Sequence, residues 1–279
     1  MDLAFFTLQG DGLLPTPIAR SMWKDDQMHG VALSGALARV AEKCAHDAGR
    51  DDLHPARWTV DLFRPASMQL CELSAEVVRD GPRICLVDVL LKQDGTRVAR
   101  ASATFLKQTQ SAPGDVWSPA DRPTAPPEDV VPSTEAPRVP FFHSEDTGWS
   151  QKFSDHQNAS RKQTWQTGMP VVAGERPTAF QAVASVADAT SMVTNWGANG
   201  VEYINTDITL ALARPAVGLE VGLVAADRIE HDGVAVGTAT VIDRAGVLGT
   251  AMVTSLANTK RVVNFENVEY TDDGQRKRV

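Results

Sequence analysis

The stretch "AFQAVASVADATSMV", residues 179–193, consists almost entirely of small and apolar residues, and Asp188 is its single charged residue. Such a run predicts a buried helix, and Pro177 just before it suits a first helical turn. No other charged residue occurs between Arg176 and Glu202, so the helix needs cover on most of its sides. We therefore expect a central helix with a sheet wrapped around it.

A lone carboxylate in such a helix needs an explanation, because carboxylates are almost never fully buried without a partner. Asp188 can cap a helix or serve as a hydrogen-bonded polar group of the core. Alternatively, it can face a cleft and act in catalysis, since carboxylates with perturbed pKa values tend to cluster at functional sites. The helix alone leaves both interpretations open.

The residues after this helix repeat a pattern found in the first half of the chain. Both segments are rich in Val, Leu and Thr, and each predicts a three-stranded antiparallel meander. The segments span residues 58–106 and 204–256. Three anchors recur about 150 residues apart, namely Arg64-Pro65 with Arg214-Pro215, Asp80-Gly81 with Asp232-Gly233 as hairpin turns, and Gly95 with Gly246.

The elements before each meander also correspond. Residues 29–48 predict the helix of the first half, with Leu33, Leu37 and Val40 near helical spacing. Extended segments precede the two helices at residues 5–16 and 161–170. Each half therefore predicts the order strand, long helix, antiparallel strands.

A proline-rich stretch separates the halves, because eight of the 16 prolines fall between Pro113 and Pro140. Such a segment is extended and poor in regular hydrogen bonds. We expect four regions: a first repeat (1–110), a linker (111–145), a second repeat that carries the site (146–260) and a polar tail (261–279).

The composition excludes several classes of function. The net charge is −8, and the body of the chain has no basic cluster, which argues against nucleic-acid and anionic-membrane partners. No apolar run is long enough to span a membrane, and residues 1–15 lack a signal-peptide pattern. The scattered Cys44, Cys71 and Cys85 predict reduced thiols, a cytoplasmic protein and no metal site. A small polyanionic ligand needs only a local basic site and stays possible.

Four segments, taken in order and spacing, resemble the double hotdog proteins of the acyl-CoA thioesterase II family. The segments are "MWKDDQMHGVALSGALARVAEK" (22–43), "VDLFRPASMQLCELSAEVVRDGPR" (60–83), "ASVADATS" (184–191) and "INTDITLALARP" (204–215). The resemblance implies an α+β fold of two fused hotdog repeats, each an antiparallel sheet around a long central helix. It also implies hydrolysis of fatty acyl-CoA to free acid and coenzyme A without metal or cofactor, by a homodimer or homotetramer.

The resemblance also implies a site in the second half, where an Asp, a Thr and a Gln hold a water against the thioester carbonyl. These positions fall on Asp188, on Asn205 or one residue from it, and on Thr254 of this chain. Asn205 and Thr254 differ from the family residues but can still donate and accept hydrogen bonds. Thioester hydrolysis needs a positioned water, a base and oxyanion donors, and a helix N-terminus would suit the donors.

Two other functions remain open on the same fold. The two replaced positions motivate a non-catalytic acyl-CoA-binding protein. A hotdog enoyl-CoA hydratase is disfavoured because residues 154–160, "SDHQNAS", lack the D-x-N-P-x-H pattern. His29-Gly30 can be a turn and helix start or a contact at a second site. Side chains that could shape an acyl groove are Phe63, Trp165, Met192 and Trp196.

Overall fold

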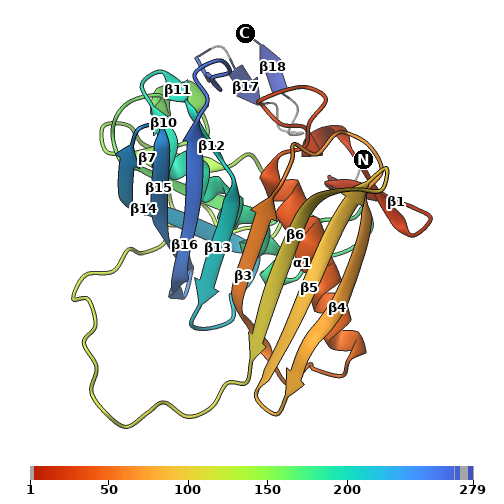
Figure 1. The fold of residues 1–279 in the computed structure, drawn as a ribbon. Helices are drawn as coiled ribbons and strands as arrows, with labels where there is room; N and C mark the ends of the chain where they lie inside the picture. Colours follow the sequence, from red (N-terminus) through yellow and green to blue (C-terminus); the bar gives the residue numbers. More distant parts are fainter. Residues whose placement is uncertain (1–2, 267, 271–275, 279) are drawn as a thin grey trace.

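A twelve-stranded antiparallel sheet dominates the computed structural model, which describes residues 3–266, 268–270 and 276–278 (Figure 1). Its strand order is β4-β5-β6-β3-β13-β16-β15-β14-β9-β7-β8, with β12 also paired to β16. The first half supplies β3 (His54–Leu62), β4 (Glu72–Gly81), β5 (Ile84–Gln93) and β6 (Thr96–Leu106). The second half supplies β7 (Phe141–Ser144), β8 (Gly148–Ser150), β9 (Lys162–Thr167), β12 (Tyr203–Asn205), β13 (Asp207–Leu212), β14 (Glu220–His231), β15 (Val234–Asp243) and β16 (Gly246–Ala257).

The two halves have the same strand order and meet at β3 and β13. Trp58 pairs with Leu210 and Val60 with Ile208 across this junction, and all four side chains are buried. The predicted three-stranded meanders are present as β4-β5-β6 and β14-β15-β16, but each repeat has a fourth strand that the prediction missed, β3 in the first half and β13 in the second. The chain leaves the sheet after β3 and after β13 near an Arg-Pro pair, because proline cannot donate to a strand ladder. Each of these two strands lies beside the last strand of its repeat, β6 or β16.

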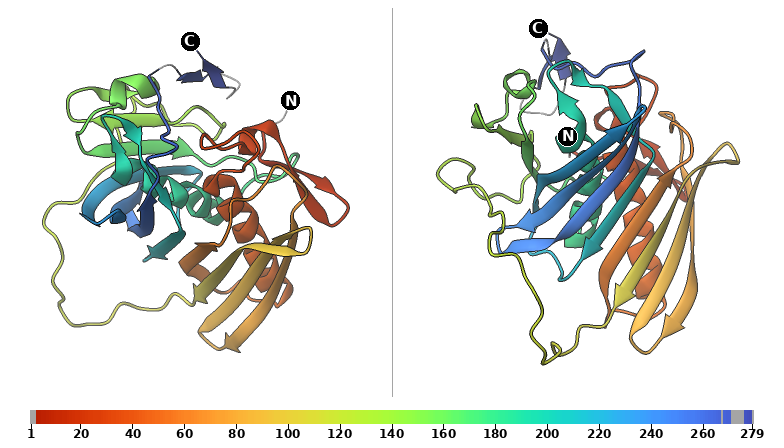
Figure 2. Two further views of the ribbon diagram at one scale, coloured as in Figure 1. Left: turned by 45° about the horizontal axis from the view of Figure 1, so that its top comes forward. Right: turned by 60° about the vertical axis from the view of Figure 1, so that its left-hand side comes forward.

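The helices lie on one face of the twisted sheet (Figure 2). Helix α1 (Gly30–Asp47) packs on β4, β5 and β6, and α3 (Thr190–Asn195) packs on β14, β15 and β16. Helix α2 (Ala179–Val186) packs on α1, where Ser34 Oγ donates to the carbonyl oxygen of Ala184 at 2.6 Å. The single helix predicted for 179–193 is interrupted, because the 3₁₀ turn η3 (Ala187–Ala189) separates α2 from α3.

Smaller elements cover the ends of this layer. The extended residues 5–16 form a separate hairpin of β1 (Phe6–Gln9) and β2 (Gly12–Pro15), which is followed by η1 (Pro17–Ala19). The predicted strand in 161–170 is β9 of the main sheet. The remaining elements are η2 (Phe153–His156), β10 (Trp196–Gly197), β11 (Gly200–Val201), β17 (Val268–Tyr270) and β18 (Arg276–Arg278).

The segment between β6 and β7 has neither helix nor strand, and Figure 1 shows part of it as a long loop away from the sheet. It coincides with the proline-rich stretch, although the four-region division remains a prediction. Among the described residues, no helix is both long and apolar enough to cross a membrane. Cys44, Cys71 and Cys85 are free thiols.

Candidate active site

Asp188 lies in η3, where the interruption between α2 and α3 brings its carboxylate to the N-terminus of α1. Asn205 Nδ2 donates to Asp188 Oδ1 at 2.9 Å, and the backbone N–H of Val31 donates to the same carboxylate. Burial raises the pKa of Asp188 to about 6, although both hydrogen bonds act in the opposite direction. A group with this pKa is ionised at neutral pH and can still accept a proton.

Gly30 makes this approach possible because it has no side chain. A Cβ added at Gly30 would overlap Oδ1 of Asp188. The carboxylate therefore occupies the space that a larger residue would fill, close to the positive end of the α1 dipole. Gly30 is the first residue of α1, so this close contact between the two halves depends on the helix beginning at this position.

His29 caps α1 and is not a second base. Its Nδ1 accepts from the Ala32 N–H at 3.0 Å, and its Nε2 donates to the carbonyl oxygen of Ile18 at 3.0 Å. Burial lowers the pKa of His29 to about 4, so the ring is neutral at physiological pH. The predicted helix start at His29-Gly30 is confirmed. His29 lines the same cavity as Asp188, so it does not belong to a separate second site.

Asn205 comes from the last position of β12, beside Ser255 of β16. Its Nδ2 also lies 3.4 Å from the carbonyl oxygen of Asp207. An ionised carboxylate offers about four acceptor positions, of which the described residues use two on Asp188. The remaining positions, together with the amide oxygen of Asn205, can hold a water molecule.

Thr254 is not brought to Asp188. The buried Val253 and Ser255 of β16 point toward the helices, so the strand alternation places the Thr254 side chain on the opposite face. Its carbonyl oxygen accepts from the Thr206 N–H at 2.9 Å, and its own N–H donates to Asp207. Thr254 does not line the cavity at Asp188, and its catalytic role stays a prediction without support from this geometry.

A cavity of about 520 Å³ opens at Asp188 and Asn205. One part of its wall is apolar and aromatic, and it is formed by Trp23, Phe142, Phe153, Met192, Val263 and Phe265. Phe142 and Phe153 meet at 4.9 Å between ring centroids, and Phe153 and Phe265 at 5.2 Å. The region predicted as a polar tail thus contributes Val263 and Phe265 to a pocket suited to an apolar group.

The charge of the cavity wall is opposite to that of the chain. Its only described carboxylate is Asp188, whereas Arg20, Arg64 and Arg138 all line it. Arg20 and Arg64 are exposed and form no ion pair with any described residue. The backbone segments that carry them are joined through Met28, which pairs with Arg20 and whose N–H donates to the carbonyl oxygen of Ala66 at 2.8 Å. A cleft of one sign concentrates ligands of the other sign.

Comparisons with known proteins identify the family. A family model described as "Acyl-CoA thioesterase N-terminal domain" matches residues 19–106, and one described as "Acyl-CoA thioesterase C-terminal domain" matches residues 114–255. The chain belongs to the acyl-CoA thioesterase family. The resemblance inferred from the four sequence segments is thereby confirmed. A comparison with curated proteins found no match.

Solved structures share the fold of this thioesterase-family chain at low identity. An acyl-CoA thioesterase II from Mycobacterium marinum has a TM-score of 0.61 and 14% identity over 91% of this chain and 94% of that one. A hot dog fold protein from Alicyclobacillus acidocaldarius has a TM-score of 0.62 and 18% identity, covering 90% and 95%. A tesB protein from Mycobacterium avium subs paratuberculosis has a TM-score of 0.59 and 15% identity over 83% of this chain and 87% of that one. The predicted α+β double hotdog fold is confirmed.

The sequence predicted part of this candidate site. Asp188 and Asn205 meet as expected, whereas the N-terminus of α1, Arg20 and Arg64 come from the first half of the chain. The role of Gly30 was not predicted, and the only hint in the sequence was that His29-Gly30 stands at a predicted helix start. Of the candidates for an acyl groove, Phe63 and Met192 line the cavity, while Trp165 and Trp196 do not.

Proposed function

We propose that this member of the acyl-CoA thioesterase family hydrolyses acyl-CoA to free acid and coenzyme A, with Asp188 as the general base. The observation that carries the proposal is the position of Asp188, whose raised pKa, helix N-terminus and apolar cavity occur together. The acyl group would occupy the aromatic part of the cavity. The coenzyme A moiety would extend past Arg20 and Arg64.

The reaction then follows from the groups present. A water held by Asp188 and the Asn205 amide oxygen attacks the thioester carbonyl while Asp188 takes its proton. The developing oxyanion needs N–H donors, and the first N–H groups of a helix have no partner within the helix. The Val31 N–H is bound to Asp188 and the Ala32 N–H to His29, which leaves the Gly30 N–H for the oxyanion. The C–S bond breaks, and protonated Asp188 returns its proton to the leaving sulfur.

The direct test is release of free coenzyme A from a series of acyl-CoAs from acetyl to stearoyl. Because Cys44, Cys71 and Cys85 are free thiols, a thiol reagent must be corrected with a protein blank. Turnover of any member would support hydrolysis and define the acyl preference. Binding of acyl-CoA without turnover would contradict the proposal.

Such a result would favour the alternative, a non-catalytic acyl-CoA-binding protein. The observation behind this alternative is that Thr254 does not reach the cavity, so the three-residue arrangement of the family is incomplete. Assembly as a homodimer or homotetramer and a cytoplasmic location also stay predictions.

Arg20→Ala and Arg64→Ala are each expected to raise KM for acyl-CoA by roughly tenfold, because each removes a charge-assisted contact to a phosphate. Their kcat should change little. The same variants should hydrolyse acyl-N-acetylcysteamine thioesters, which lack the phosphates, at the wild-type kcat/KM. Arg83→Ala is the matched control, since Arg83 is exposed but does not line the cavity. An equal loss on both substrate types would contradict a phosphate-binding role.

A further inference from the structure

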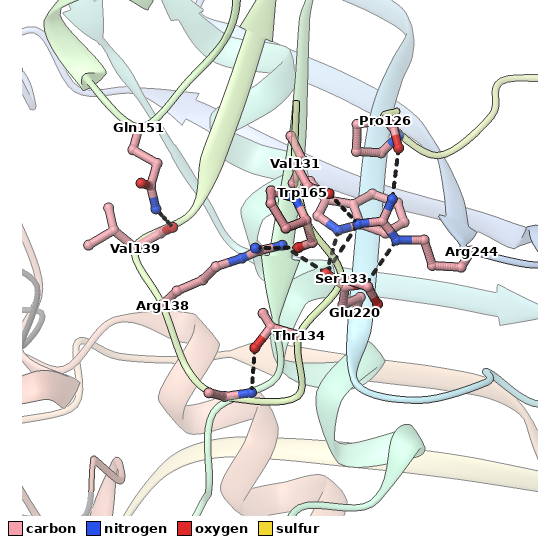
Figure 3. A network of polar contacts seen from close by, with 12 residues as sticks. Pro126, Val131, Ser133, Thr134, Arg138, Val139, Gln151, Trp165, Glu220 and Arg244 are labelled. Atoms are coloured by element: carbon pink, nitrogen blue, oxygen red, sulfur yellow. Dashed lines mark hydrogen bonds and ion pairs between the residues drawn. The ribbon is translucent and has the colours of Figure 1, made fainter. Parts of the chain in front are cut away.

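The segment that joins the two halves is attached to the sheet by contacts with one buried carboxylate, that of Glu220 (Figure 3). Glu220 begins β14 and is 5% exposed. It accepts hydrogen bonds from Arg138 at 2.7 Å, Arg244 at 2.9 Å, Trp165 Nε1 at 3.0 Å and Ser133 at 3.1 Å. One carboxylate thus holds two guanidinium groups together, and one of them, Arg138, belongs to the linker.

The same two arginines bind the backbone of the linker. Arg244 donates to the carbonyl oxygens of Pro126 and Val131, both at 2.7 Å, and Arg138 donates to that of Pro132 at 2.7 Å. A proline-rich segment has few N–H groups with which to join a strand ladder, so these side chains replace a ladder. We call Glu220, Arg138 and Arg244 the Glu220 clamp.

Apolar contacts strengthen the docking of the clamped part only. Val131 is fully buried against Trp165 and Ile242, and Arg244 lies over the Trp165 ring at 4.7 Å. Earlier in the linker, Val116 is 88% exposed and Trp117 is 85% exposed. The linker therefore consists of a free part and a part fixed to the second half.

The fixed part ends at the cavity. Arg138, Val139, Pro140 and Phe142 all line the cavity that contains Asp188. Arg138 contributes both to the Glu220 clamp and to this wall, and its guanidinium lies 5.1 Å from the centroid of the Phe141 ring. Displacement of Arg138 would therefore move the wall without altering Asp188 or Asn205.

We propose that the Glu220 clamp determines the acyl preference by fixing residues 138–142 as one wall of the acyl cavity. Without the charge of Glu220, Arg138 and Arg244 would be two neighbouring cations with no described carboxylate between them. Their repulsion, or loss of the Arg244 hydrogen bonds that hold Pro126 and Val131, would release the wall and admit acyl groups that the clamped wall excludes. Glu220 is then a positioning residue that acts through the linker. The role in substrate choice rests on the proposed function, whereas the clamp itself does not.

Glu220→Gln tests this proposal because it removes the charge and keeps the shape. Arg244→Met is the second variant, since it releases Pro126 and Val131 but changes no residue that lines the cavity. Glu135→Gln is the matched control in the same linker, because Glu135 forms an exposed ion pair with Arg176 at 2.6 Å. Thermal melts establish that each variant is folded.

The first readout needs no activity. Trypsin can cut the linker after Lys107 and after Arg138, whereas Arg122 precedes a proline and is resistant. Cleavage after Arg138 should become roughly tenfold faster in Glu220→Gln and Arg244→Met, as expected for loss of about one buried charge-assisted contact. Cleavage after Lys107 should stay at the wild-type rate and serves as the internal reference.

The second readout is the affinity for S-alkyl-CoA thioethers of increasing chain length, which cannot be hydrolysed, measured by calorimetry. The ratio of the affinity for the best-bound chain length to the affinity for the next longer chain should fall several-fold in both variants. It should stay unchanged in Glu135→Gln. Faster cleavage with an unchanged chain-length profile would overturn the proposal, as would two folded variants that match the wild type in both readouts. Thioether binding without thioester turnover would refute the proposed hydrolysis alone. Absence of thioether binding by the wild type would overturn both.

Discussion

Asp188→Asn is expected to lower kcat/KM for acyl-CoA by roughly 10²–10⁴-fold, the usual contribution of a general base. The amide has the same size but cannot take a proton from water. Acyl-CoA binding should persist, because the cavity wall and the arginines are unchanged. Steady-state kinetics beside calorimetry with an S-alkyl-CoA thioether measures both quantities. Turnover within a few-fold of the wild type would exclude Asp188 as the base.

The pH profile gives an independent test of the same residue. Asp188 must be ionised to act as a base, and burial raises its pKa to about 6. The kcat/KM of the wild type should therefore be level above about pH 6 and fall about tenfold per unit below it. His29, with its pKa lowered to about 4, cannot produce this transition. A level profile down to pH 5 would contradict the assignment.

As pH rises, the contribution of Asp188 to folding stability should fall, whereas its contribution to activity should rise. The pKa of Asp188 is about 6 in the folded chain and lies near 3.8 without burial, so the folded state binds more protons between these values. Ionised Asp188 therefore lowers stability as pH rises through that window. Asp188→Asn should melt at a higher temperature than the wild type at neutral pH, and this difference should disappear below about pH 4. A lower melting temperature at neutral pH would identify Asp188 as a structural group.

The repeat, the central helices and the position of Asp188 in a buried helical segment could be predicted because local sequence patterns encode them. The Arg-Pro pairs follow the ends of strands, and Asp232-Gly233 is the predicted hairpin turn. The turn predicted at Asp80-Gly81 is wrong, because both residues pair within β4 and β5 and the turn lies two residues later, at 82–83. A charge in an apolar helix is conspicuous in any sequence. The placement of β3 beside β6, and of β13 beside β16, depends on tertiary packing, and the alternation of side chains within a strand does not reveal it.

Thr254 shows a different limit of the sequence. Side chains along a strand alternate between faces, so an alignment that is wrong by one residue assigns the opposite face. Ser255, its neighbour, points inward and pairs in register with Asn205, yet its hydroxyl accepts from Asn195. The Glu220 clamp was equally hidden, because its members are separated by 24 and 82 positions.

Gly30→Ala is expected to lower kcat/KM by roughly 10²-fold, although Ala is the better helix former by up to about 1 kcal/mol. The added methyl would overlap the Asp188 carboxylate, which must then leave the N–H of Val31. Gly114→Ala is the control, because nothing lies within 4 Å of a Cβ at that position.

A double-mutant cycle with Asp188→Ala separates this steric effect from a general effect on the helix. In the Asp188→Ala background the carboxylate is gone, so Gly30→Ala should lower kcat/KM little further and should raise the melting temperature. The loss of activity caused by the two changes together should therefore be far smaller than the product of their separate losses. Losses that multiply would mean that Gly30 acts independently of Asp188, and the position of the carboxylate at the α1 N-terminus would not be what catalysis requires.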